Sequence, residues 1–556
     1  MGLYLLDYGA GNVQSLANSL SKLGHRFTWI SSPEDFHKAT SLVFPGVGAF
    51  GHAIEGLTSR GLLEPLREYI RSGKPYFGIC IGMQILFQSS AESKDVEGLG
   101  IIPCPIVRFD DADKAVPHMG WNGADLLDPE ISTPAAEGID HREHYYFVHS
   151  FRATYDPTTY PEAASWAHTT TQYGQEVFVA SVRKANVFGT QFHPEKSGDA
   201  GLKLIDNWLS QPEVQRATAP PTARKVRLPE RVGGLTKRII ACMDVRANDQ
   251  GDLVVTKGDQ YDVRESSGAT AETAGAVRNL GKPVALAARY YESGADELCL
   301  LNITSFRHSP LHDQPMLAVV RAAAECVFVP LTIGGGIKDS VDPDGTKRSA
   351  LEVAGAYFRA GADKVSIGSE AVYAVERLRG NGGKGDGTSA IETIALAYGR
   401  QAVVVSIDPR RVYVDPETYR GPYTAELVHG QADSPERGKA WWYQCTVSGG
   451  REARPLSVLE LAQGAEALGA GEILLNSIDR DGTGLGFDLD LVRIVKDNVK
   501  VPVVASSGAG SKAHFVEVFE GTRVEAALAA GIFHRGEVSI HGVKEEMQMK
   551  GIATRI

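Results

Sequence analysis

The chain has 556 residues, long enough for two or three domains that each bury a core. Its formal net charge of −11 argues against nucleic acid as a partner, because proteins that bind nucleic acid carry basic surfaces. We expect no membrane contact, since no apolar run reaches the roughly 20 residues of a membrane span and no signal peptide is visible.

A glycine-flanked cysteine, Cys80, stands out in residues 76–84, which read Tyr-Phe-Gly-Ile-Cys-Ile-Gly-Met-Gln. The apolar residues before Cys80 predict a strand and those after it predict a helix. Gly78 and Gly82 permit a sharp elbow that turns a nucleophile outward and leaves backbone N–H groups facing the reacting carbon. The helix dipole favours the thiolate. We predict that Cys80 is a nucleophile, although a lone cysteine after an apolar strand is usually a core residue.

The matching base is predicted at His193, in the sequence Gln-Phe-His-Pro-Glu that ends at Glu195. A histidine can take the thiol proton, and a carboxylate two residues later can fix its tautomer. Pro194 stiffens the spacing between them. The alternative is a histidine at a strand end beside a solvated glutamate.

These motifs resemble the class I glutamine amidotransferases over residues 1–210. The sequence Phe-Pro-Gly-Val-Gly at 44–48 is similar to that family's glycine loop, although its glycines could merely form a turn. The resemblance implies that Cys80 attacks the side-chain amide of L-glutamine, that His193 moves the proton and that Glu195 orients His193, so that ammonia leaves. It also implies an oxyanion hole at Val47, Gly48 and Ile81.

A second domain is predicted after a linker. Residues 211–235 are rich in proline and charge and lack apolar periodicity. Short strand-like segments then alternate with alanine-rich helical ones over residues 236–556, which predicts a (β/α)₈ barrel. The fold class is therefore α/β, with a doubly wound amidotransferase domain fused to a barrel.

An internal repeat supports the barrel. Residues 239–246 are similar to 403–410, residues 294–301 to 469–476, and residues 329–337 to 501–510. A repeat of about 165–175 residues indicates a duplicated half-barrel, because solenoid units are only about 20–50 residues long.

Two aspartates follow equivalent strands of this repeat, Asp244 and Asp408. Function in such barrels lies at the carboxyl ends of the strands. Two carboxylates facing one mouth suit a general acid and a general base whose pKa values differ. The alternative for each is an N-cap of the following helix.

Glycine-rich strand ends predict phosphate cradles in both half-barrels. A turn is the alternative for each, but the duplication favours an elongated bisphosphate substrate that spans the mouth. The predicted binding residues are Lys257, Gly334, Gly335, Gly336, Ser369, Asp481, Gly482, Thr483, Ser507, Gly508 and Gly510.

The barrel resembles the cyclase of imidazole glycerol phosphate synthases, and the fused order resembles the single-chain form of fungi and plants. Asp244 and Asp408 match the family's acid and base, and Lys257 matches its active-site lysine. The resemblance further implies an ammonia gate at the amino end of the barrel; a structural salt-bridge ring is the plainer interpretation of the same residues, Arg238, Glu297, Lys364 and Glu472. Ser506 and Gly531 depart from the family's usual residues, which leaves one cradle in doubt.

The implied reaction joins the two domains. Ammonia crosses the barrel and attacks the keto group of a phosphoribulosyl formimino aminoimidazole carboxamide ribonucleotide, which yields imidazole glycerol phosphate and aminoimidazole carboxamide ribotide. A monomer suffices for this, with the two domains in contact near four residues that could equally be ordinary packing or surface charge: Trp121, Tyr146, Lys196 and Asp363.

Three other functions remain open. A glutaminase-barrel pyridoxal phosphate synthase would need barrel lysines as Schiff bases, a sugar-phosphate isomerase would not need the glutaminase, and a non-catalytic sensor would not need an intact triad. The inserts near 338–350, 376–390 and 410–455 have no assigned role.

The six cysteines form no Cys-x-x-Cys pair, which favours the reducing cytoplasm over a disulfide framework. No cluster of metal-ligating residues stands out, so we expect neither a metal nor an organic cofactor.

Overall fold

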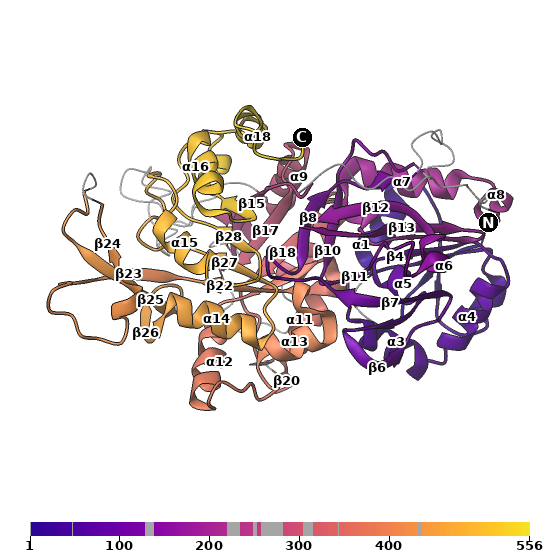
Figure 1. The fold of residues 1–556 in the computed structure, drawn as a ribbon, viewed down its shortest axis with the longest axis horizontal. Helices are drawn as coiled ribbons and strands as arrows, with labels where there is room; N and C mark the ends of the chain where they lie inside the picture. Colours follow the sequence, from indigo (N-terminus) through magenta and orange to yellow (C-terminus); the bar gives the residue numbers. More distant parts are fainter. Residues whose placement is uncertain are drawn as a thin grey trace.

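The computed structural model describes residues 2–9, 11–46, 48–127, 138–218, 234–247, 253–256, 282–303, 315–342, 344–431 and 435–556. Val47 and Lys257, both predicted site residues, lie outside these ranges. Figure 1 shows two bodies side by side, the N-terminal body in indigo to magenta and the barrel in rose through orange to yellow. Within the ranges described, no helix is both long and apolar enough to cross a membrane.

The N-terminal body is built on an eight-stranded sheet. Its order is β2 (Thr28–Ile30), β1 (Leu3–Leu6), β3 (Ser41–Phe44), β4 (Tyr76–Ile79), β14 (Val187–Thr190), β13 (Glu176–Lys184), β12 (Ala167–Tyr173) and β9 (Asp125–Leu126). The first five strands are parallel. Every residue of β1, β3, β4 and β14 is buried, as expected for strands covered on both faces.

Helices cover this sheet and two smaller sheets extend it. The helices are α1 (Gln14–Lys22), α2 (Asp35–Lys38), α3 (Phe50–Ser59), α4 (Leu63–Arg71), α5 (Ile81–Gln84), α6 (Pro161–Ala164), α7 (Gly198–Ser210) and α8 (Glu213–Ala217), with a 3₁₀ turn η1 (Pro194–Lys196). One small sheet pairs β8 (His118–Asn122) with β10 (Tyr145–His149); the other joins β5 (Phe87–Ser90), β6 (Ser93–Glu97), β7 (Ile102–Arg108) and β11 (Phe151–Ala153). Helix α8 lies within the segment predicted as a linker.

The C-terminal body is a closed barrel of eight parallel strands, which confirms the predicted architecture. They are β15 (Arg238–Ala247), β17 (Glu297–Asn302), β18 (Leu331–Gly334), β21 (Lys364–Ile367), β22 (Val403–Ile407), β27 (Glu472–Leu475), β28 (Val503–Ala505) and β29 (Ala526–Ala529). Strand β29 pairs back with β15 and closes the barrel. Strands β15 and β22 are first and fifth in this order, which places the two half-barrels as the repeat predicts.

Helices surround the barrel, and several begin at a capping box, in which a serine and a glutamate satisfy each other's backbone N–H groups. The capping boxes begin α11 (Ala350–Ala360), α13 (Ala390–Tyr398) and α14 (Val458–Leu468). The other helices are α9 (Pro283–Glu292), α10 (Pro315–Ala324), α12 (Ser369–Gly380), α15 (Leu489–Lys496), α16 (Lys512–Thr522), α17 (Gly531–His534) and α18 (Ile540–Met549), with 3₁₀ turns η3 (Arg400–Ala402) and η4 (Thr424–Glu426).

Strand β15 shows how side chains divide between the barrel's inside and outside. Ile239 and Met243 pack in the cluster formed with the helices, whereas Ile240 and Cys242 belong to a separate cluster made of barrel strands alone. By the period of two, Arg238 and Asp244 share the inner face with them. Asp244 lies six positions after Arg238, about 20 Å along the strand.

The remaining strands lie outside the barrel. Strand β16 (Leu253–Thr256) pairs antiparallel with β15. Strands β19 (Ser340–Val341) and β20 (Lys347–Arg348) form a hairpin in the insert near 338–350. The insert after β22 forms an antiparallel sheet that projects at the far left of Figure 1, made of β23 (Pro409–Val414), β24 (Val428–His429), β25 (Ala440–Val447) and β26 (Glu452–Ser457).

The amino end of the barrel contacts the N-terminal body. Trp121 Nε1 donates to the carbonyl of Asp296 (3.1 Å). Lys196 forms an ion pair with Asp363 (2.8 Å), and Asn12 also donates to Asp363 (2.8 Å). These contacts confirm the predicted position of Trp121, Lys196 and Asp363 at the boundary between the two bodies.

Candidate active sites

Cys80 stands at the predicted elbow, between β4 and α5. Its backbone φ of 45° and ψ of −100° are unusual for a residue other than glycine, and such strain is concentrated at functional sites. Gly78 is required by the close approach of the two arms, because a Cβ there would lie 2.3 Å from the carbonyl oxygen of Gly82. The local sequence therefore forces Cys80 into this position.

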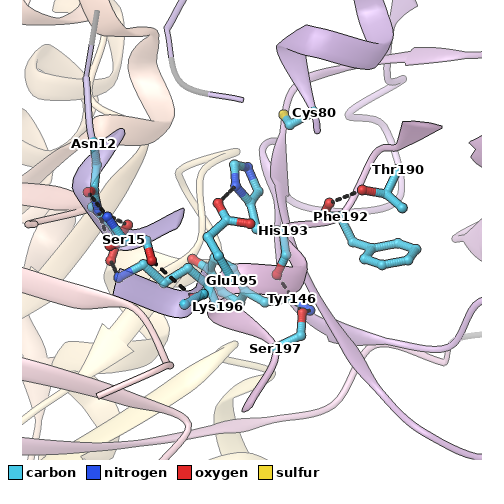
Figure 2. A network of polar contacts seen from close by, with 12 residues as sticks. Asn12, Ser15, Cys80, Tyr146, Thr190, Phe192, His193, Glu195, Lys196 and Ser197 are labelled. Atoms are coloured by element: carbon cyan, nitrogen blue, oxygen red, sulfur yellow. Dashed lines mark hydrogen bonds and ion pairs between the residues drawn. The ribbon is translucent and has the colours of Figure 1, made fainter. Parts of the chain in front are cut away.

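His193 and Glu195 lie beside Cys80 and form the rest of the predicted triad. His193 Nδ1 lies 2.8 Å from Glu195 Oε1, and both side chains are buried. Figure 2 shows the His193 ring between the Cys80 thiol and the Glu195 carboxylate. With Nδ1–H directed at the carboxylate, the other ring nitrogen is left for the thiol. This is the arrangement that a cysteine nucleophile and its base require.

The charge balance around His193 favours its protonated form. Burial alone disfavours the imidazolium, but the carboxylate of Glu195 and the hydrogen-bonded thiolate of Cys80 outweigh it. Together they raise the pKa of His193 well above its ordinary value. The protonated imidazole of His193 is therefore favoured beside Glu195 and Cys80.

Backbone contacts hold the histidine in place. The N–H of His193 donates to the carbonyl of Tyr146 (2.9 Å), and Ser197 Oγ donates to the carbonyl of His193 (2.6 Å). The N–H of Tyr146 donates to the same Ser197 hydroxyl (2.9 Å), which closes the network. The base is thus fixed to β10, the strand that faces the barrel.

A cavity of about 60 Å³ adjoins Cys80 and spans the boundary between the two bodies. Gly48 and Ile81, two of the predicted oxyanion residues, line it, and the third, Val47, lies outside the described residues. From the barrel side the cavity is lined by Lys364, Tyr398 and Gln401, among others.

Sequence reasoning missed several residues that line this cavity or contact its lining. Gln191 Nε2 lies 3.4 Å from Cys80 Sγ, and Gln84 donates to the Gln191 side chain (3.0 Å). Glu92 accepts from the N–H of Phe50 (2.7 Å), and burial raises its pKa. Gln84 and Gln191 do lie within the two motifs, so their positions carried a signal. Glu92 follows β5 in no recognisable motif.

The four predicted gate residues meet in one buried ring at the amino end of the barrel. Arg238 contacts both Glu297 (2.7 Å) and Glu472, and Lys364 contacts the same two glutamates (2.6 Å each). Each side chain is at most 2% exposed. Although burial opposes it, Arg238 and Lys364 together lower the pKa of Glu472. The ring is therefore a neutral set of two cations and two carboxylates.

A larger cavity of about 500 Å³ opens at the carboxyl end of the barrel. Asp244 and Asp408 both line it, which confirms that they share one mouth. Many of the predicted binding residues of the second half-barrel line it too, namely Asp481, Gly482, Thr483, Ser507, Gly508 and Gly510.

The predicted residues of the first half-barrel are placed differently. Gly334, Gly335, Gly336 and Ser369 do not belong to the described lining of this cavity. A Cβ at Gly335 would lie 2.3 Å from the carbonyl oxygen of Asn302, so close strand packing accounts for this glycine. The hydroxyl of Ser369 accepts from the N–H of Ser448 (3.0 Å) in the insert. Their phosphate role stays a prediction, as does that of Lys257.

Asp408 is half-buried just after β22 and is contacted by an amide. Asn476 Nδ2 donates to Asp408 Oδ1 (2.7 Å) and to Ser406 Oγ (3.2 Å). Burial raises the pKa of Asp408, and the hydrogen bond from Asn476 opposes that rise. A carboxylate with a raised pKa suits proton transfer near neutral pH.

Comparison with known proteins gives two family matches that divide the chain as the structure does. The class I glutamine amidotransferase model matches residues 4–211, and the histidine biosynthesis protein model matches residues 238–539. These two segments contain the triad and the barrel, respectively.

Three curated relatives match almost the whole chain. Imidazole glycerol phosphate synthase hisHF of Emericella nidulans is 52% identical and covers 100% of this chain and 98% of its own. The protein of the same name from Schizosaccharomyces pombe is 51% identical, with 99% of both chains covered. The hisHF protein of Arabidopsis thaliana, described as chloroplastic, is 51% identical over 99% of this chain and 89% of its own. The chain therefore belongs to the single-chain imidazole glycerol phosphate synthases, the glutamine-dependent enzymes of histidine biosynthesis.

Proposed function

We propose that Cys80, His193 and Glu195 release ammonia from glutamine. Cys80 attacks the side-chain amide to form a thioester, His193 gives its proton to the leaving ammonia, and water then frees glutamate. The strained elbow, the buried His193–Glu195 contact and the raised pKa of His193 support these roles. Backbone N–H groups at Val47, Gly48 and Ile81 are proposed to hold the oxyanion.

We further propose that this ammonia passes through the ring formed by Arg238, Glu297, Lys364 and Glu472 into the barrel. The single observation that carries the coupled function is the small cavity lined both by Cys80 and by Lys364 of the ring. Beyond the ring, Ile240 and Cys242 belong to a buried, mostly apolar cluster. An enclosed apolar path keeps ammonia unprotonated, and only the unprotonated form has a nucleophilic lone pair.

At the other end, ammonia attacks the keto group of the phosphoribulosyl formimino aminoimidazole carboxamide ribonucleotide. Asp408 is proposed as base and Asp244 as acid during ring closure and C–N cleavage, which release imidazole glycerol phosphate and aminoimidazole carboxamide ribotide. The cavity at the carboxyl end of the barrel is called the mouth cavity below. Its volume of about 500 Å³ suits a ligand of this size, because small-molecule sites are about 300–1,000 Å³.

The proposal extends to assembly and location. One chain carries both sites, so a monomer is sufficient, with residues 1–210 and 236–556 as its two domains. All six cysteines are free thiols, which supports a reducing compartment such as the cytoplasm.

The direct test follows glutamate and imidazole glycerol phosphate in one tube, with and without the ribonucleotide. We expect the ribonucleotide to stimulate glutamate release, with one product formed per glutamate. Cys80→Ala should release no glutamate yet still form product from ammonium salt at alkaline pH. Cys326→Ala, which removes a half-buried thiol elsewhere, should behave like the wild type.

Two results would contradict the proposal. Glutamate release that ignores the ribonucleotide, with no imidazole product, would mean that the barrel serves another acceptor. A Cys80→Ala protein that is inactive even with ammonium salt would refute the division of labour between the two sites.

A further inference from the structure

The insert sheet after β22 contacts a loop that lines the mouth cavity. This loop runs from Ser477, after β27, to Asp488, the N-cap of α15. Its middle, Asp481 to Thr483, lines the cavity together with Asp408 and is exposed to solvent. A substrate in the mouth would meet this exposed segment directly.

One residue of the insert contacts both ends of the loop. The backbone N–H of Arg411, on β23, donates to Asp479 Oδ2 (2.8 Å) at the start of the loop. The guanidinium of Arg411 donates to Asp488 Oδ2 through Nη2 (2.8 Å) and Nε (3.2 Å) at its end. Arg411 also lies three residues after Asp408, the proposed base. It therefore connects the loop to the chain segment that carries this carboxylate.

The Asp488 end of this contact is buried and crowded. The side chain of Asp488 is 2% exposed and that of Arg411 is 7% exposed. Tyr443 donates its hydroxyl to Asp488 Oδ1 (2.8 Å), and the Arg411 guanidinium lies 4.4 Å from the centroid of the Trp441 ring. A buried carboxylate that loses its charged partner must move or become protonated. The position of the loop therefore depends on Arg411.

We propose that Arg411 is a positioning residue for the cyclase reaction. It holds the two ends of the 477–488 loop so that Asp481, Gly482 and Thr483 face Asp408 across the mouth. This gives the insert near 410–455 a role in substrate binding, and it rests on the function proposed above.

The test compares Arg411→Met with Arg454→Met. Arg454 is an ion-paired arginine of the same sheet, but it contacts Glu376 (2.8 Å) on α12 and not the loop. Cyclisation is measured with ammonium salt as the nitrogen source, so that only the barrel is assayed. Glutamate release without ribonucleotide and the melting temperature report whether each chain is folded.

We expect Arg411→Met to raise KM for the ribonucleotide roughly ten- to a hundredfold, since misplacing substrate-positioning groups by about 1 Å can cost a hundredfold. Arg454→Met should leave KM unchanged. Arg411→Lys should recover part of the loss, because it keeps the charge but not the planar fork. A merely structural role would lower the melting temperature of Arg411→Met and leave KM unchanged.

If Arg411→Met does not fold, Tyr443→Phe removes only the hydroxyl contact to Asp488 and should raise KM several-fold. An unchanged KM in the folded variant, with an active wild type, would overturn this inference alone. A wild type that forms no product from the ribonucleotide would overturn the proposed function and this inference with it.

Discussion

The two ends of the barrel hold carboxylates in opposite ways. At the amino end, Glu297 and Glu472 each contact both Arg238 and Lys364, so the ring is neutral. At the carboxyl end, a neutral amide, Asn476, donates to Asp408, and burial raises the pKa of that carboxyl. Carboxylates paired with cations stay ionised. A carboxylate that accepts a hydrogen bond from a neutral amide can instead gain and lose a proton during the reaction.

The barrel therefore uses charge in two ways, one at each end. As the proposed gate, the neutral ring would present no unpaired charge that could bind or protonate ammonia. Among the described residues, Asp408 contacts an amide and no cation, so it can exchange a proton. Three substitutions test this contrast.

The largest effect is expected from Asp408→Asn. An amide cannot accept the proton, so cyclisation should fall about 10²–10⁴-fold. Basal glutamate release should persist, because the triad lies in the other body. The measurement is product formation from glutamine and from ammonium salt. Asp415→Asn, at an exposed position in the insert, is the control, and an active Asp408→Asn would exclude this carboxylate as the base.

A smaller effect is expected from Lys364→Met at the ring. Two glutamates would then share Arg238 alone, and breaking a buried ion pair costs about 3–5 kcal/mol of unfolding free energy. We expect a lower free energy of unfolding in urea and more than one glutamate released per product, as ammonia escapes.

The matched control for the ring is Lys496→Met. Lys496 pairs with Glu525 (2.5 Å), just before β29 and outside the ring. This variant should keep the one-to-one ratio. A one-to-one ratio and full stability in Lys364→Met would show that the ring neither closes the passage nor stabilises the barrel.

The smallest effect is expected from Asn476→Leu. The Asn476 hydrogen bond lowers the pKa of Asp408 against the effect of burial, so its loss should raise that pKa further. A base must be ionised to act, so the acidic limb of the cyclase pH profile should move to higher pH. Asn498→Leu, at an exposed position, should not move it. A shift to lower pH would refute the assigned direction.

The elbow at Cys80 and the barrel could be predicted from sequence patterns. The pattern of the elbow is local, and that of the barrel is repeated along the chain. Gly78 and Gly82 flank Cys80 within five residues, and the half-barrel repeat needs no knowledge of contacts. The ring was expected from family resemblance; the residue pattern alone allowed a plain salt-bridge ring, and the geometry fits both.

The residues that sequence reasoning missed depend on contacts between distant elements. Asn476 meets Asp408 because β27 pairs with β22. Arg411 meets Asp488 across 77 residues of sequence. The side chain of Gln191 contacts that of Cys80 across 111 residues of sequence. None of these partners follows from spacing, because the strand order must be known first.

The ion pair between Lys196 and Asp363 affects what happens when the two bodies separate. Lys196 follows Glu195, which contacts the proposed base His193, and Asp363 precedes Lys364, which belongs to the ring. The pair (2.8 Å) therefore ties the triad to the ring through two peptide bonds. A separation of the two bodies wide enough to leak ammonia would break this tie and disturb Glu195. We expect an enzyme whose two bodies have separated to stop producing ammonia. Damage to the contact between the bodies would therefore waste little glutamine.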